Sequence, residues 1–207
     1  MSLPQGWSCG NESGQGGAAS ANINSGILST SLSNVGGGSN SYAFATTQSG
    51  TFPWSPCQAP ANGVLPSTLK SISSTFVMNS ILNTGGRFHI YIALYYWLPN
   101  GAQVSGGSSY QCLDTQVRAE NINGAWTSAG TTETYNPGDS FGWDQVTLAN
   151  LSVGPTYTLT ANISQQCARD ESSYGISAPC QLAGIEIGIE GFQFQELNIS
   201  FTSVSLS

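Results

Sequence analysis

Two glutamates lie four residues apart in the segment Leu182-Ala-Gly-Ile-Glu-Ile-Gly-Ile-Glu-Gly-Phe192. In a β-strand the side chains alternate, so Glu186 and Glu190 would share one face while the three isoleucines between and before them point into a core. Paired carboxyl groups are what acid–base and nucleophilic catalysis use. Gly188 lies between the two acids on their face, which predicts close approach of a ligand to the strand. A solvated face of an edge strand is the alternative interpretation.

The segment Phe88–Leu98 also alternates, and one of its faces is aromatic. The face predicted to join the core carries Phe88, Ile90, Ile92 and Leu94. The opposite face carries His89, Tyr91, Tyr95 and Trp97. Sugar rings stack on aromatic side chains because their C–H faces behave as apolar surface. This face therefore predicts carbohydrate binding, although burial of both faces is the alternative, and a lone histidine is more often a satisfied core residue than a catalyst.

A third strand, predicted over Tyr110–Arg118, supplies another carboxylate. Asp114 opposite Glu190 would complete an acid and nucleophile pair. A surface contact between Asp114 and Arg118 is the alternative. Retaining glycosidases place the two carboxyl groups about 5 to 5.5 Å apart. Residues four apart on one strand are separated by about 13 Å, so Glu186 and Glu190 are excluded as that pair.

The elements that would position these groups are β-strands. Alternation predicts strands over residues 68–82, 87–98, 110–118, 141–148, 156–163, 184–194 and 197–206. Residues 1–50 are rich in Gly, Ser and Asn, but weak alternation at 23–32 and 42–45 favours short twisted strands over disorder. A short helical turn is allowed only at 165–173. Antiparallel strands at this spacing predict a single all-β domain over residues 1–207, a β-sandwich that is curved if it holds a ligand.

Composition excludes several classes of partner. Charged residues make up 7% of the chain, the net charge is −7, and Lys and Arg together number 4. These values argue against binding to nucleic acid or to an anionic membrane surface. The sequence has no run of about 18 apolar residues that could span a membrane, and its first residues lack the pattern of a signal peptide, which indicates a processed or engineered start. Because polarity comes mainly from uncharged side chains, an acidic extracellular habitat is a reasonable hypothesis.

The cysteines and sequons point to the same compartment. The five cysteines form no CxxC pair and there is one histidine, so no metal site is expected. Together with the Asn-X-Ser sequons they predict a secreted glycoprotein with disulfide bonds. The sequons begin at Asn11, Asn150, Asn162 and Asn198. Among the possible connectivities, one hypothesis pairs Cys9 with Cys57 and Cys167 with Cys180, and leaves Cys112 as the odd thiol.

Several segments together resemble glycoside hydrolase family 12, the endo-β-glucanases. Residues 182–192 resemble the strand that ends in Glu-X-Gly-Thr-Glu, which implies that Glu190 is the general acid/base. Residues 88–98 resemble a strand ending in Ile-Trp-Phe or Ser-Trp-Leu, in which Trp97 matches the tryptophan. Pro53-Trp54 followed by Gly63-Val-Leu-Pro66 resembles the loop before the central strands. Trp7 matches, by order, a tryptophan that lines the glycone side of the cleft.

The chain departs from this family at the nucleophile. The family motif Glu-Ile-Met-Ile-Trp is replaced by Cys112-Leu-Asp114-Thr-Gln116, so Asp114 is the candidate nucleophile or the nucleophile is absent. A neighbouring acidic residue of the family is Tyr95 here. The resemblance implies a concanavalin-like jelly roll, a single antiparallel β-sandwich with a concave ligand cleft.

We therefore expect a secreted, retaining, endo-acting glycosidase on β-1,4- or mixed-linkage glucan, with activity in acid as a hypothesis. Glu190, with a raised pKa, would be the acid and Asp114 the nucleophile. The expected substrate-binding residues are Trp7, Trp54, Tyr91, Tyr95, Trp97 and Glu186. No cofactor is expected, the partner is a polysaccharide, and the protein is expected to be an extracellular monomer. Two alternatives stay open: a non-catalytic carbohydrate-binding or cell-surface protein, and a glutamic-type acid peptidase that uses Glu190 with Gln116 or Gln111.

Overall fold

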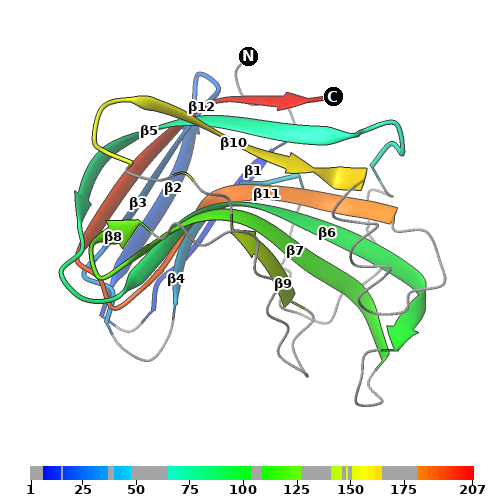
Figure 1. Ribbon diagram of the computed structural model, residues 1–207, viewed down its shortest axis with the longest axis horizontal. Coiled ribbons are helices and arrows are strands. Elements are labelled where there is room, and N and C mark those ends of the chain that lie inside the picture. The colour runs from blue at the N-terminus through cyan, green and yellow to red at the C-terminus, as the bar shows by residue number, and fades with distance from the viewer. Residues whose placement is uncertain are drawn as a thin grey trace.

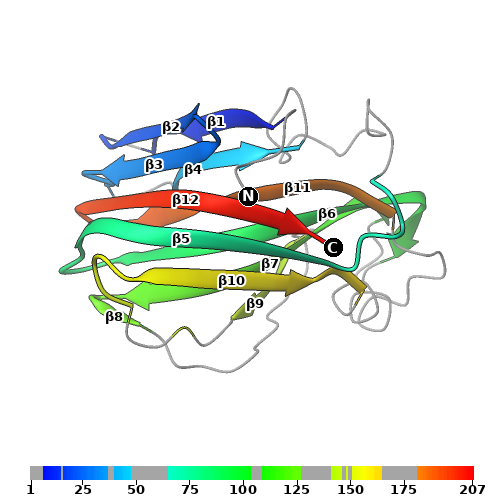
Figure 2. The same cartoon turned by 90° about the horizontal axis from the view of Figure 1, so that it is seen from above.

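The computed structural model describes residues 7–14, 16–36, 40–47, 65–103, 109–126, 141–145, 148, 151–164 and 181–207. For residues 97–103, 109–115, 141–145 and 181 only the backbone is described. Two β-sheets lie face to face (Figures 1 and 2), which confirms the predicted all-β sandwich. No helix in the described part of the chain is long and apolar enough to cross a membrane.

The strands follow the alternation of the sequence. They are β1 (Ser8–Glu12), β2 (Ala18–Asn24), β3 (Ile27–Ser33), β4 (Ser41–Thr46), β5 (Ser71–Leu82), β6 (Arg87–Gln103), β7 (Ser109–Ile122), β8 (Ala125–Trp126), β9 (Phe141–Gln145), β10 (Thr156–Asn162), β11 (Gln181–Phe192) and β12 (Glu196–Leu206). The sequence did not predict β1, whose five residues show no apolar alternation, β8, which has two residues, or β2 before residue 23. The helical turn considered at 165–173 lies outside the described residues.

The larger sheet has the order β1-β4-β11-β6-β7-β8, and β9 also pairs with β7. The smaller sheet has the order β10-β5-β12-β3-β2. Strand pairs are antiparallel, as predicted, except that β9 runs parallel to β7. Figure 1 shows β11, β6 and β7 bending together beneath the smaller sheet. The strands that carry the predicted functional residues, β11, β6 and β7, are therefore neighbours.

The core lies between the two sheets. From the larger sheet it receives the predicted apolar face of β6, together with Ile185, Ile187 and Ile189 of β11. From the smaller sheet it receives Phe76 and Phe201, which are also fully buried. Burial of each such side chain stabilises the fold by about 1.5 to 3 kcal/mol. The core thus occupies one face of β11 and β6 and leaves the other face for polar groups.

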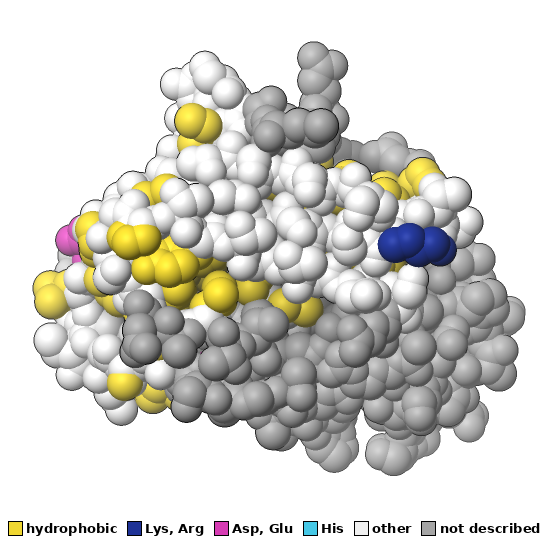
Figure 3. Space-filling model, turned by 45° about the horizontal axis from the view of Figure 1, so that its top comes forward, with side chains coloured by type: hydrophobic (Ala, Val, Ile, Leu, Met, Phe, Trp, Pro, Cys, Tyr) yellow, Lys and Arg dark blue, Asp and Glu magenta, His cyan; other side chains and the backbone are white. Residues whose placement is uncertain are grey.

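Uncharged polar side chains cover the outer face of the smaller sheet. Hydroxyl groups pair across neighbouring strands, with Ser20 and Ser31 at 2.7 Å and Ser73 and Thr160 at 2.8 Å. Figure 3 shows a surface on which charged groups are sparse. The low charge content of the sequence is therefore expressed as a surface of hydroxyl and amide groups.

Gly188 makes room for an aromatic ring rather than for a ligand. A Cβ atom at this position would lie 2.6 Å from the carbonyl oxygen of Ala43 and 2.7 Å from the Cβ of Phe44. On the other side of Phe44, a Cβ at Gly10 would lie 2.4 Å from the ring. The expected close approach of a ligand at Gly188 is therefore wrong, because the backbone of β4 and the Phe44 side chain fill that space.

We predict that Gly188→Ala destabilises the fold by about 2 kcal/mol, since the new methyl group meets backbone that cannot move aside easily. Gly85→Ala is the matched control, because no heavy atom lies within 4 Å of the Cβ position there. Urea unfolding of the three proteins measures both effects. Equal stability of Gly188→Ala and Gly85→Ala would contradict the packing described above.

Candidate active site

Acidic and aromatic side chains gather on the face of the larger sheet that points away from the core. Cα partners on neighbouring strands place their side chains on the same face. Glu190 on β11 is paired with Tyr42 on β4 and with His89 on β6, and His89 is paired with Glu120 on β7. We call Tyr42, Glu190, His89 and Glu120 the Glu190 row.

A second polar row crosses the same face four residues further along β11. Glu186 is paired with Thr46 on β4 and with Ala93 on β6, and Ala93 is paired with Gln116 on β7. We call Thr46, Glu186, Ala93 and Gln116 the Glu186 row. Tyr91 lies between the two rows. The predicted shared face of Glu186, Glu190 and Tyr91 is therefore confirmed.

These side chains are buried although they point away from the core. The exposed fraction is 6% for Glu190, 2% for Glu186 and 1% for Tyr91. Burial of both faces of β6, which the sequence left open as an alternative, is therefore what the structure shows. In such surroundings charges interact strongly and need partners.

Glu190 is held by hydrogen-bond donors and a cation. The Nε2 atom of His89 and the amide of Asn40 each contact one of its carboxylate oxygens. Burial alone would raise the pKa of Glu190, but the contacts with His89, the Tyr42 hydroxyl and the charge of Arg118 lower it below its ordinary value. The expectation that this carboxyl is protonated is therefore wrong. Its partners keep it ionised.

His89 is a buried histidine that contacts Glu190. Burial lowers the pKa of its imidazole, and the charge of Glu190 opposes this shift only in part. Its Nε2 atom contacts Glu190, and its Nδ1 atom has no hydrogen-bond partner among the described residues. His89 therefore positions Glu190 by donating a hydrogen bond.

Glu186 has the opposite electrostatic character. Burial raises its pKa to about 8, the charge of Glu190 adds to the shift, and hydrogen bonds from Tyr91 and Tyr95 oppose it. Tyr91 donates to the Oε1 atom of Glu186, whereas Oε2 has no partner among the described residues. At neutral pH Glu186 is a neutral acid and Glu190 a carboxylate. Carboxyl groups whose pKa values are driven apart in this way are typical of acid–base sites.

The structure does not bring Asp114 to Glu190. Asp114 is paired with Tyr95, six residues along β7 from Glu120 in the Glu190 row. This corresponds to about 20 Å along the strand, far beyond the separation needed for a retaining pair. The side chain of Asp114 lies outside those described, but its place in the register corrects the predicted pairing.

Glu120 takes the place expected of Asp114. Its Cα lies two strand spacings, or about 10 Å, from that of Glu190 across the single strand β6. Glu120 is 5% exposed, and its Oε1 atom is 3.6 Å from Nη2 of Arg118. The sequence contained a signal for this residue, since Gln116, Arg118 and Glu120 alternate, but the predicted strand ended at Arg118.

Only some of the aromatic residues expected to bind substrate are placed by the structure on the face that carries Glu190. Tyr91 and Tyr95 lie on the Glu190 face, as predicted. Trp97 belongs to β6, but its side chain is not described, and Trp54 lies outside the described residues. Trp7 is half-buried and packs against the core between the sheets. It therefore packs with the core and not with the carboxyl groups.

The cysteine and metal predictions concern other parts of the molecule. Cys9 is an exposed free thiol, so the predicted bond to Cys57 is not formed. The proposed pair of Cys167 and Cys180 lies outside the described residues. Within the described ranges, no group of three or more His, Cys, Asp or Glu side chains could hold a metal ion.

Comparisons with known proteins identify the fold. No family model matches the sequence, and no curated protein matches it. A loop-swap mutant of Xyn11A from Necallimastix patriciarum covers 99% of this chain and 94% of its own, with 8% identity and a TM-score of 0.55. Endoglucanase Cel12A from Rhodothermus marinus covers 97% of this chain and 98% of its own, with 14% identity and a TM-score of 0.50. The chain has a glycoside hydrolase jelly-roll fold. Identities this low show the fold alone, and membership of family 12 stays a prediction.

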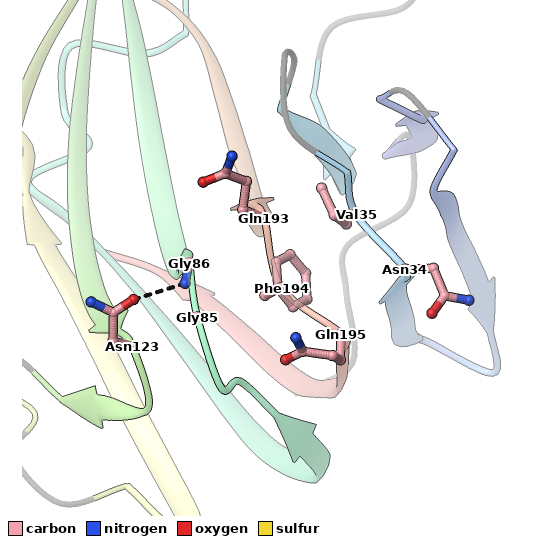
Figure 4. Close-up of a pocket in the computed structure, with 8 residues that line it drawn as sticks. All are labelled: Asn34, Val35, Gly85, Gly86, Asn123, Gln193, Phe194 and Gln195. Atoms are coloured by element: carbon pink, nitrogen blue, oxygen red, sulfur yellow. Dashed lines mark hydrogen bonds between the residues drawn. The ribbon is translucent and has the colours of Figure 1, made fainter.

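A separate hollow lies at one end of this jelly roll, where several connections meet. It has a volume of about 640 Å³ and is lined by Asn34, Val35, Gly85, Gly86, Asn123, Gln193, Phe194 and Gln195 (Figure 4). Asn34, Asn123 and Gln193 have φ angles of 50°, 50° and 57°. The side chain of Asn123 accepts a hydrogen bond from the backbone of Gly86 at 2.8 Å. Asparagine with a positive φ angle is typical of tight turns, so the turns themselves explain the conformations of Asn34 and Asn123. None of the predicted site residues lines this hollow.

We predict that Glu186→Gln changes the pH dependence of stability. The folded-state pKa of Glu186, about 8, lies above its ordinary value of 4.5. Protonated Glu186 therefore stabilises the folded protein to the full extent below about pH 4.5, and this stabilisation is lost as the pH rises through 8. Over this pH range the free energy of unfolding of the native protein should fall by on the order of 4 kcal/mol relative to that of Glu186→Gln, whose amide stays neutral.

Urea unfolding between pH 4 and pH 9 measures this difference. Glu190→Gln is the control of opposite sign, because its lowered pKa stabilises the native protein above the ordinary pKa and loses this effect as the pH falls. A difference between native protein and Glu186→Gln that does not change with pH would show that the folded state does not raise the pKa of Glu186.

Proposed function

We propose that the protein is an endo-acting glycosidase that cleaves β-1,4- or mixed-linkage glucan with retention of configuration. One observation carries the proposal: Glu190 and Glu120 lie in the same row, on either side of His89, on a buried face of a glycoside hydrolase jelly roll. Side chains that lean toward each other over one strand can narrow the Cα spacing of about 10 Å to the roughly 5 to 5.5 Å that a retaining pair uses.

The electrostatics support a division of roles within the pair. Glu190 is ionised, so it attacks the anomeric carbon and forms the glycosyl–enzyme bond. Glu120 protonates the leaving oxygen in the first step and removes a proton from water in the second. Its Oε1 atom forms an ion pair with Arg118, at 3.6 Å from Nη2. This assignment reverses the role of Glu190 implied by the resemblance to family 12.

The proposal includes a polysaccharide partner and an extracellular location. A net charge of −7 and the paired hydroxyl groups on the outer face of the smaller sheet support a neutral polymer as substrate. The same composition supports activity in acid, because the surface keeps its polarity when carboxylates are protonated. Secretion follows from the nature of the substrate.

A non-catalytic carbohydrate-binding protein is the second candidate. The observation that favours it is the burial of Glu190 and Glu120, each less than a tenth exposed and each in contact with a basic side chain. The acid peptidase alternative receives no such support. Gln116 lies in the Glu186 row, about 13 Å along the strand from the position opposite Glu190, and the side chain of Gln111 is not described.

We predict that Glu190→Gln and Glu120→Gln each reduce hydrolysis by several orders of magnitude, because each removes one of the two reacting carboxyl groups. Asp114→Asn should keep activity close to native. A reducing-sugar assay on mixed-linkage glucan, carboxymethyl cellulose and xylan at pH 4 and pH 7 measures all three.

The outcomes separate the candidates. Loss of activity in Asp114→Asn with full activity in Glu120→Gln would restore the pair predicted from the sequence. A native protein that binds these polysaccharides but releases no reducing ends would establish the binding function instead.

A further inference from the structure

Three of the four Asn-X-Ser sequons lie in the described part of the chain, and the structure gives each of them different surroundings. They begin at Asn11, Asn162 and Asn198. Asn11 and Asn162 are exposed, whereas Asn198 is half-buried. Asn11 belongs to β1 and Asn162 to β10, each the last strand at one end of its sheet, while Asn198 belongs to β12 at the centre of the smaller sheet.

Asn162 ends β10 and points outward from the smaller sheet. Leu159 and Ala161 of the same strand are buried in the core, so the alternate position of Asn162 faces solvent. The middle residue of the sequon, Ile163, is buried, and its backbone N–H donates to a carbonyl oxygen at 2.9 Å. Ser164 is exposed again. The asparagine and the serine of this sequon are therefore both on the surface, on either side of an anchored residue.

The amide of Asn198 is committed to hydrogen bonds within the sheet. Its Nδ2 atom donates to Oγ of Ser80 and, at 2.8 Å, to Oε1 of Glu196. A side-chain amide nitrogen carries two hydrogens, so these two hydrogen bonds use both. Ser80 also donates to the same oxygen of Glu196. Replacing one amide hydrogen by a sugar would therefore break a connected group of three side chains.

We propose that Asn162 is an N-glycosylation site and that Asn198 stays unmodified in the folded protein. In this reaction the amide nitrogen bonds to the anomeric carbon of an oligosaccharide, the bond from that carbon to the diphosphate of a lipid-linked donor breaks, and the nitrogen loses one proton. The sequon is what marks the acceptor asparagine in a secreted protein. The inference therefore rests on the extracellular location that the proposed function includes.

The folded sheet accommodates a glycan at one position and not at the other. Because the glycan is attached as the chain enters the secretory compartment, folding must accommodate it. In the described part of the chain, β10 has a sheet neighbour on one side only (Figure 2), so a glycan at Asn162 extends into solvent. A glycan at Asn198 costs a hydrogen bond between neighbouring side chains. Chains modified at Asn198 are therefore depleted from the folded, secreted protein.

Peptide mapping of the full chain, secreted from a yeast that performs N-glycosylation, tests the site. Enzymatic release of glycans in heavy-oxygen water converts each glycosylated asparagine to a labelled aspartate, which mass spectrometry locates. We expect label at Asn162 in most molecules and none at Asn198. Ser164→Ala, which breaks the sequon and keeps Asn162, should lose this label and reduce the intact mass by one glycan. Ser200→Ala breaks the sequon at Asn198 in the same way and is the matched control, with no loss of glycan.

Secreted native protein that is unlabelled at Asn162, or labelled at Asn198, would overturn the inference. The native protein decides this even if Ser164→Ala does not fold. Ser164→Ala should hydrolyse glucan as the native protein does, because the core separates the outer face of the smaller sheet from the face that carries Glu190. Hydrolysis by a protein unmodified at Asn162 would end this inference and leave the proposed activity standing. A glycan on Asn162 of a protein inert on every glucan would do the reverse.

Discussion

Enclosing carboxyl groups on the second face of a β-sheet is the constraint on which this site depends. An isolated carboxylate removed from water is strongly unfavourable, so each acid must either acquire donors or stay protonated. Glu190 acquires partners and stays ionised, with His89, Asn40 and Tyr42 around it. Glu186 stays protonated. Two glutamates on one strand therefore differ in charge because of what the neighbouring strands place beside them.

The sheet makes this arrangement possible by separating stability from chemistry. Alternation along β11 and β6 sends isoleucine, leucine and phenylalanine side chains into the core and leaves the other face available for polar groups. Substitutions on the polar face therefore need not open cavities in the core. Phe44, lying between Gly10 and Gly188, shows that part of the polar face is also used for packing.

The sequence predicted the layers better than it predicted the site. Alternation located the strands because one side of each is apolar, and it placed Glu186, Glu190 and Tyr91 together since period 2 fixes the face. It could not show which positions of β7 lie opposite β11, because that register is set by pairing through β6. Because the strand predicted from alternation ends at Arg118, the sequence offers Asp114 as the second carboxylate, whereas the register places Glu120 there. The sequence could not predict the lowered pKa of Glu190, because Tyr42 in β4 and Asn40 just before it lie about 150 positions away in the chain.

The pairing of β11 with β4 has a consequence for the order in which the protein folds. Strands from the first quarter of the chain hydrogen-bond to a strand near its end, so forming this sheet requires closing a very long loop. Topologies dominated by such distant contacts fold slowly, since the entropy of loop closure must be lost before the contacts form. The Glu190 row draws on β4, β6, β7 and β11, and no amino-terminal fragment that ends before β11 contains all four. We therefore expect the site to assemble only in the final stage of folding, after synthesis has passed β11.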